Sequence, residues 1–196
     1  SRGLNNNREG DLGPVYGHQW RHFNASYSGC DNDYTNKGVD QLENVVKALS
    51  CPKQRNSRRL IVSAWNPCQI DQMALPPCHI LMHFNVIKDH LTCSVYQRSG
   101  DVGLGIPFNI ASYSMLTHLI AWHCGLHAKE FHYYLGNCHI YDDHIEPLVE
   151  QTSRRPMKFP SLTFRKKRDR IDQYKVSDFI IDDYNSYSTI KMDMRQ

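Results

Sequence analysis

The sequence lacks any long hydrophobic run. No segment approaches the roughly 18 apolar residues of a membrane-spanning helix, and no secretory-signal pattern is recognisable near the first residue. We therefore expect neither a membrane span nor a cleaved leader. The net charge is also small: 23 Lys and Arg and 20 Asp and Glu give +3. This slight excess disfavours a nucleic-acid-binding protein.

Short motifs for metal binding or disulfide exchange are missing as well. The seven cysteines are scattered and never form Cys-x-x-Cys, which disfavours zinc ribbons and thioredoxin-like sites. Their odd number predicts free thiols in a reducing compartment, namely the cytoplasm, with the nucleus and the mitochondrion left open. Eleven histidines are present without a His-Glu-x-x-His motif, and we expect no catalytic metal.

The composition is that of a folded domain. Hydrophobic residues make up 40% of the 196 residues and aromatic residues 11%, enough to bury a core within one domain. Periodicity predicts helices at 38–49, 108–126 and 144–151, and strands at 60–65, 79–87, 91–97, 131–141 and 162–165. Residues 1–13 are interpreted as loop. The fold class predicted is α+β: a mixed sheet packed with a long buried central helix at 108–126 and smaller surface helices.

Cys78 is the first candidate for chemistry. It follows Pro76 and Pro77, which restrict the backbone, and it precedes His79 at the start of a predicted strand. A cysteine held in this way can present its sulfur to a pocket, and a neighbouring Arg or His can favour the thiolate. The alternative is a small buried hydrophobic residue, as most cysteines are.

Other polar residues carry weaker signals, each with an ordinary structural alternative. Arg98 and Ser99 are suited to gripping a phosphate, or Arg98 pairs with Asp101. Asn109 can read a pyrimidine edge, or it caps the following helix. Arg58 and Arg59 form a pair that binds an anion or lies at a solvated edge. His139 and Tyr141 alternate along a strand, where they hold a sugar or are groups of the core. The basic run 165–168 is a solvated turn or an RNA contact.

Five stretches in order resemble thymidylate synthase. They are Gly-Asp-Leu-Gly-Pro-Val-Tyr-Gly (10–17), Met-Ala-Leu-Pro-Pro-Cys-His (73–79), Tyr-Gln-Arg-Ser (96–99), Pro-Phe-Asn-Ile-Ala-Ser-Tyr (107–113) and His-Ile-Tyr (139–141). The resemblance extends from about 10 to 194. It implies a thymidylate synthase-like fold, and an enzyme that converts dUMP to dTMP with 5,10-methylenetetrahydrofolate as carbon donor and reductant.

The resemblance assigns a role to each candidate residue. Cys78 would add to C6 of uracil, and the folate would then deliver the methylene carbon and a hydride. Arg98 would favour the thiolate and, with Ser99, bind the phosphate, and Tyr16 would take part in proton transfer near C5. Gln97 and Asn109 would lie in the nucleotide site, and His139 and Tyr141 would hold the ribose 3′-hydroxyl. Asp101 and Gly105 would lie beside the folate, and Arg58 and Arg59 would bind the phosphate of a partner subunit's substrate in a homodimer.

Departures from the family pattern shape the domain prediction. The family carries a further N-terminal segment, its tail ends in small apolar residues, and Asn137 and Cys138 here replace the usual Asp and Ala. We expect residues 1–196 to form one thymidylate synthase domain that is incomplete at its N-terminus. Alternatives are a dUMP hydroxymethylase, a non-catalytic nucleotide-binding fragment, and the C-terminal part of a fusion with dihydrofolate reductase.

Overall fold

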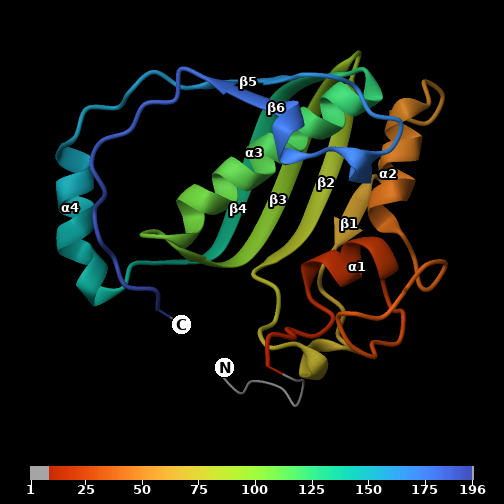
Figure 1. The fold of residues 1–196 in the computed structure, drawn as a ribbon, viewed down its shortest axis with the longest axis horizontal. Coiled ribbons are helices and arrows are strands. Elements are labelled where there is room, and N and C mark those ends of the chain that lie inside the picture. The colour runs from red at the N-terminus through yellow and green to blue at the C-terminus, as the bar shows by residue number, and fades with distance from the viewer. Residues whose placement is uncertain (1–8, 196) are drawn as a thin grey trace.

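A mixed four-stranded sheet is the centre of the molecule. The computed structural model describes residues 9–195. Strands β1 (Ile61–Ser63), β2 (His79–Ile87), β3 (His90–Asp101) and β4 (His127–His139) lie in chain order across the sheet. The first three are antiparallel, and β4 runs parallel to β3. The helices packed against this sheet (Figure 1) confirm the predicted α+β class.

The β2–β3 hairpin carries the core residues as the sequence alternation predicts. Met82, Phe84 and Val86 are buried on one face of β2. Lys88 adopts a left-handed φ of 59° in the tight turn before β3. The second strand was predicted to end at residue 97 but continues to Asp101. The extra residues pair with β4, so Arg98 and Ser99 lie within the sheet.

Helix α3 (Gly105–Cys124) lies across β3 and β4 (Figure 1). Gly125 follows the last helical residue and caps the C-terminus with a φ of 68°, a left-handed conformation that most residues disfavour. The predicted burial of this helix is confirmed for one face and is wrong for the other. Tyr113 and Ile120 face the core, whereas Phe108 is 72% exposed and Trp122 is 41% exposed. One helix face packs on the sheet, and an apolar composition alone could not tell which neighbours cover the other.

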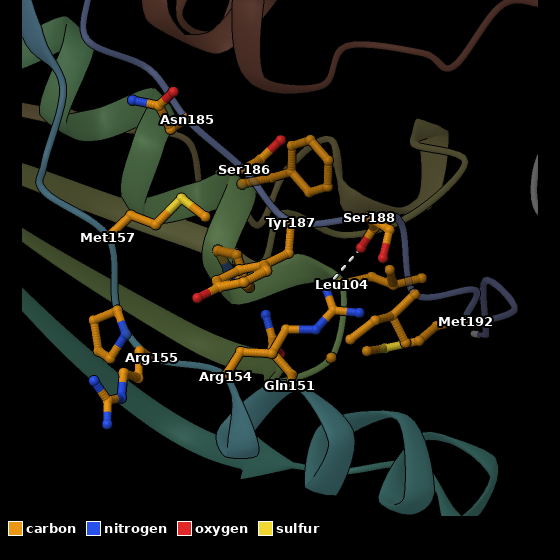
Figure 2. Close-up of a pocket in the computed structure, with 15 residues that line it drawn as sticks. Leu104, Gln151, Arg154, Arg155, Met157, Asn185, Ser186, Tyr187, Ser188 and Met192 are labelled. Carbon is orange, nitrogen blue, oxygen red and sulfur yellow. Dashed lines mark hydrogen bonds between the residues drawn. The ribbon is translucent and has the colours of Figure 1, made fainter.

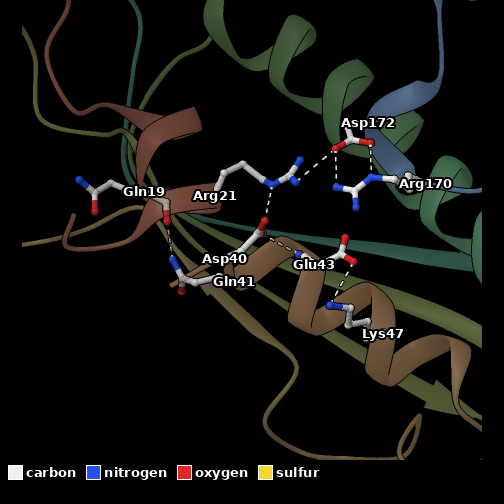
Figure 3. A network of polar contacts seen from close by, with 8 residues as sticks. All are labelled: Gln19, Arg21, Asp40, Gln41, Glu43, Lys47, Arg170 and Asp172. Carbon is white, nitrogen blue, oxygen red and sulfur yellow. Dashed lines mark hydrogen bonds and ion pairs between the residues drawn. The ribbon is translucent and has the colours of Figure 1, made fainter. Parts of the chain in front are cut away.

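Helix α2 (Gln41–Ser50) is the predicted amphipathic helix, with Leu42, Val45, Val46 and Leu49 buried. It begins three residues later than the 38 expected, because Asp40 caps its N-terminus by accepting the Glu43 N–H at 2.9 Å. Helix α1 (Tyr16–His22) was not predicted. Its Arg21 joins Asp40 at 2.9 Å and Asp172 at 3.5 Å (Figure 3). This ion-pair network links α1 and the start of α2 with the C-terminal part of the chain.

The C-terminal third runs back over the sheet and helix α3. Helix α4 is Ile145–Ser153, and strands β5 (Ser161–Phe164) and β6 (Phe179–Asp182) pair antiparallel. Trp122 of α3 stacks on Phe164 of β5, with ring centroids 5.6 Å apart. Short 3₁₀ turns complete the elements: Ile70–Gln72, Asp142–His144, Ile171–Gln173 and Val176–Asp178. The loop prediction for 1–13 falls partly on residues 1–8, which lie outside the described residues.

Candidate active site

Cys78 is fixed by its backbone at the entry to β2. Its N–H donates to the Tyr16 hydroxyl oxygen at 2.7 Å, and its carbonyl accepts the Arg98 N–H at 2.8 Å. The thiol is free and only half-buried. These contacts leave the Cys78 side chain with a defined direction and access to a ligand.

The Arg98 side chain clamps the two prolines that precede Cys78. Its guanidinium donates to the Pro77 carbonyl at 3.0 Å and to the Pro76 carbonyl at 2.8 Å. The same guanidinium lies 5.9 Å from the ring centre of Trp65. These contacts take the place of the Arg98–Asp101 pair that was the structural alternative. They tie a cation to the cysteine turn.

Tyr16 and His79 are both desolvated beside this turn. Burial raises the pKa of Tyr16, so its hydroxyl keeps its proton at neutral pH. Burial lowers the pKa of His79, although a hydrogen bond with Asn109 opposes the shift. The His79 ring lies 5.2 Å from the rings of both Tyr16 and Tyr113. A neutral phenol and a neutral imidazole therefore line the cysteine turn.

Asn109 belongs to a polar network and does not cap α3. Gln97, which is 2% exposed, donates to the Asn109 side-chain oxygen at 3.1 Å and to the Ser99 carbonyl at 2.7 Å. Gln97 in turn accepts a hydrogen bond from the Tyr133 hydroxyl. Burial raises the pKa of Tyr133 to about 12. The network fixes which end of the Asn109 amide is oxygen.

Asp101 caps the loop that leads into α3. Its carboxylate accepts the N–H groups of Gly103, Leu104 and Gly105 at 2.9, 3.2 and 3.3 Å. A side chain at Gly105 would begin 3.4 Å from the Asp101 Cβ and 3.7 Å from the Asn109 oxygen. Asp101 thus holds the backbone of this loop in addition to the folate contact that the family resemblance implies for it.

His139 and Tyr141 lie together at the end of β4, next to Asp101. Their rings meet edge-on with centroids 5.2 Å apart, and the His139 carbonyl accepts the Val102 N–H at 3.0 Å. In the β3–β4 register His139 pairs with Asp101, and Ser99 pairs with Asn137. The expected phosphate, ribose and folate residues therefore share one end of the sheet.

Arg58 and Arg59 are not brought to Cys78 within one chain. Both are exposed and precede β1, whose Ile61 pairs with His83 of β2. At the rise of an extended strand, Arg59 lies about 20 Å along the sheet from Cys78. A role for this pair at the cysteine requires a second copy.

A cavity of about 530 Å³ opens beside the Asp101 loop (Figure 2). Leu104 and Phe108 of the α3 N-terminus form one wall, and Arg154, Tyr187 and Met192 lie on other sides. Arg154 donates to the Ser188 carbonyl at 2.6 Å and lies over the Tyr187 ring. The apolar walls suit a flat ring, and Arg154 is also paired with Glu150 at 2.6 Å.

The histidine spacing leaves room for a metal site, but the described residues do not form one. Histidines recur four residues apart at His18 and His22, at His79 and His83, and at His123 and His127. Among residues 9–195, however, no group of three or more candidate ligands converges on a metal site. Nor does any helix in this range have the length and apolar character needed to cross a membrane. All seven cysteines fall within the described residues, and none of them forms a disulfide.

Three residues of this region were missed as site residues by sequence reasoning: His79, Trp65 and Tyr133. His79 had one available signal, its position directly after Cys78. The others contact residues far along the chain, as Tyr133 does with Gln97, which is 36 positions away. Periodicity carries no information about such contacts.

Comparison with known proteins identifies the family. The thymidylate synthase family model matches residues 4–196. The chain is 53% identical to a probable thymidylate synthase of Schizosaccharomyces pombe, covering 99% of this chain and 32% of that protein. It is 50% identical to thymidylate synthase of Homo sapiens, covering 99% and 61%.

A fused relative shows the same likeness. The bifunctional dihydrofolate reductase-thymidylate synthase of Leishmania major is 48% identical over 99% of this chain and 37% of its own length. The chain thus spans less than two thirds of each of these three relatives. With the family model matching nearly every residue, and with Cys78, Arg98 and Asn109 gathered at one end of the sheet, the chain belongs to the thymidylate synthase family.

Proposed function

We propose that this chain methylates dUMP to dTMP with 5,10-methylenetetrahydrofolate, leaving dihydrofolate. The observation that carries the proposal is the setting of Cys78: a half-buried free thiol whose backbone is held by Tyr16 and Arg98. A nucleophile needs a fixed direction and a nearby cation, and both are present. The relatives named thymidylate synthase support the same reaction.

Cys78 is the catalytic nucleophile in this proposal. Its sulfur bonds to C6 of uracil, which makes C5 nucleophilic toward the one-carbon unit. The C6–S bond breaks at the end, when the C5 proton has been removed and the new methyl group has received its hydride. Arg98 stabilises the thiolate beforehand. Tyr16 keeps its proton at neutral pH because burial raises its pKa, so it can take part in the proton-transfer network near C5. The folate supplies the one-carbon unit and the hydride.

The amide of Asn109 selects the base. Because Gln97 donates to the Asn109 oxygen, the amide nitrogen is directed elsewhere and can donate to O4 of uracil. Cytosine presents an amino group at that position, which is itself a donor. The arrangement therefore favours dUMP over dCMP.

The residues on either side of the Asp101 loop bind the rest of the nucleotide and the folate in this proposal. Arg98 and Ser99 hold the phosphate, and His139 with Tyr141 holds the ribose 3′-hydroxyl. Asp101 and Gly105 contact the pterin of the folate, whose aromatic portion extends into the cavity beside Leu104 and Phe108. The apolar lining suits such a flat ring.

A homodimer completes the site in this proposal. The helices α2 and α3 cover one face of the sheet (Figure 1), and the opposite face carries exposed residues such as Tyr96 and Ile87. Packing two copies through these faces would carry Arg58 and Arg59 toward the partner's phosphate. We also propose a reducing compartment such as the cytoplasm, because none of the seven cysteines forms a disulfide.

Product analysis tests the proposal. The full chain, incubated with dUMP and methylenetetrahydrofolate, is expected to form dTMP and dihydrofolate, as identified by mass. A hydroxymethylated product would instead indicate a dUMP hydroxymethylase. Cys78→Ala should abolish product, and Cys68→Ala, at an exposed thiol, is the matched control. Unchanged dTMP formation by Cys78→Ala would refute the proposal.

A further inference from the structure

His144 is a fully buried histidine for which the proposed reaction has no use. It closes the 3₁₀ turn before α4, and its side chain is 0% exposed. Its ring meets Tyr141 edge-on at 5.6 Å, and Tyr141 in turn meets His139. Burying an imidazole destabilises the fold unless its ring nitrogens have polar partners.

One ring nitrogen holds the C-terminal tail, defined here as residues 184–195. His144 Nε2 lies 2.7 Å from the Asp193 carbonyl oxygen. A carbonyl oxygen only accepts hydrogen bonds, so Nε2 must carry a proton and donate. Two further contacts hold the tail: Arg195 on Asp143 at 2.6 Å, and Arg154 on the Ser188 carbonyl at 2.6 Å.

The other ring nitrogen faces the carboxylate that caps α3. His144 Nδ1 is buried, has no hydrogen-bond partner among the described residues, and lies 3.7 Å from Asp101 Oδ1. Because Nε2 already carries a proton, a neutral ring presents its lone pair to Asp101. A second proton has one place to go, Nδ1, where it would be shared with Asp101 as a charge-assisted contact.

The His144 ring occupies the space that a side chain at position 103 would need. A Cβ at Gly103 would lie 2.5 Å from His144 Nδ1 and 3.2 Å from the Met192 sulfur. The first distance is a severe clash, and the second is a tight contact with the tail. Only a residue without a side chain lets the ring, the loop and the tail meet here.

We propose that His144 is a positioning residue that couples docking of the tail to the placement of Asp101. When the tail is docked, the Asp193 carbonyl fixes Nε2–H and aims Nδ1 at Asp101. When the tail leaves, the ring loses its anchor and Asp101 loses its neighbour. The coupling is reciprocal: where the docked tail strengthens the binding of a ligand at Asp101, that ligand strengthens the docking of the tail by the same factor. The inference rests on the proposed function only in taking that ligand to be the folate.

Histidine tautomers in the ligand-free chain give the first test. Nitrogen-15 NMR of the full chain is expected to show His144 protonated at Nε2. Truncation after Met192 and, separately, Asp101→Asn should each shift the His144 nitrogen signals and leave those of exposed His132 unchanged. An Nδ1–H tautomer, or a His144 signal indifferent to both changes, would overturn the proposal. This test needs no turnover, so it stands even where dTMP formation fails.

Two substitutions separate the ring nitrogens in the full chain. His144→Gln can keep a donor near Nε2, and His144→Asn can keep one near Nδ1. We expect His144→Gln to raise the folate KM roughly tenfold, with dUMP affinity unchanged and the tail still protected from trypsin at Lys191. We expect His144→Asn to expose Lys191 to cleavage. Equal losses of dUMP and folate affinity in both variants would indicate simple structural damage and contradict the proposal.

Discussion

Arg98 connects the fold and the proposed chemistry through backbone carbonyls. Its guanidinium binds the Pro76 and Pro77 carbonyls, while its own N–H binds the Cys78 carbonyl. A planar fork can satisfy two carbonyls at once, which an ammonium group on a flexible stem does poorly. The cysteine turn therefore depends on the shape of arginine as well as on its charge.

Substituting Arg98→Lys tests this dependence. We expect a loss of about 2 kcal/mol in unfolding free energy, because at least one carbonyl loses its charged donor, and a weaker affinity for dUMP. Denaturant unfolding and calorimetry measure the two effects. Arg165→Lys, at an exposed arginine that also donates to a carbonyl, should leave both nearly unchanged. Wild-type stability and affinity in Arg98→Lys would contradict the account.

The site residues that sequence reasoning found are those with a local signal. Cys78 follows two prolines, and Arg98 lies in a motif that resembles a known family. His144 gave no such signal, because its partner Asp193 is 49 residues away. The hydrogen bond of Asn109 with Gln97 was likewise hidden, since it joins a helix to a strand. Side-chain partners across elements require the fold.

Helix α2 shows how one cap can serve two purposes. Asp40 accepts the Glu43 N–H at the helix start and also pairs with Arg21 of α1 (Figure 3). The first contact satisfies an N–H that has no partner within the helix. The second fixes α1, which carries Tyr16, against α2. The cap therefore bears on the position of a proposed catalytic residue.

Removing this cap has a measurable cost. Asp40→Ala is expected to lower the unfolding free energy by about 1–2 kcal/mol, read from urea denaturation. Glu43→Gln is the matched control, because it loses only a surface ion pair with Lys47, worth about 0.5 kcal/mol or less. A variant Asp40→Ala as stable as Glu43→Gln would show that the capping hydrogen bond contributes nothing.

Regular apolar spacing predicted the elements well, and its failures have definite causes. The strand at His79–Ile87 has the predicted bounds, and the α2 face is the predicted one. Helix α1 was missed because its buried member is Gln19, which bonds Gln69 and the Pro14 carbonyl and adds no apolar signal. For α3, apolar residues on all sides could not tell which face the sheet would cover.

Three histidines with lowered pKa values make the whole molecule less stable in acid. Burial lowers the pKa of His18, His79 and His123 in the folded chain. The unfolded chain therefore binds more protons just below pH 6.5, and stability must fall as the pH falls through that region. Asp172 and Asp178 have pKa values below the ordinary value of 3.8, so their stabilising contribution is lost only at lower pH.

Melting temperatures between pH 7 and pH 5 test this. We expect a decrease of a few degrees, about what 1 kcal/mol gives in a protein of this size. His79→Gln should flatten the decrease, and His132→Gln, at an exposed histidine, should not. A melting temperature constant across this window would contradict the assignment of neutral, desolvated histidines.

Assembly into a dimer makes a prediction of its own. Arg58 and Arg59 serve the partner's site in the proposal, so a double variant Arg58→Ala/Arg59→Ala and the single variant Cys78→Ala should each be inactive or weak. Mixed and reassociated, they should recover part of the dTMP formation, because one site of the mixed dimer has every group intact. No recovery, with mixed dimers demonstrated by mass, would remove the pair from the partner's site.

A covalent adduct tests the central claim most directly. Fluorine at C5 of 5-fluoro-dUMP cannot leave as the proton does, so the reaction should stall with nucleotide and folate bound to the enzyme. Mass spectrometry of the full chain, incubated with 5-fluoro-dUMP and methylenetetrahydrofolate, is expected to reveal a ternary adduct at Cys78 that is absent from Cys78→Ser. A folded, dimeric chain with no adduct, or an adduct at another cysteine, would contradict the account.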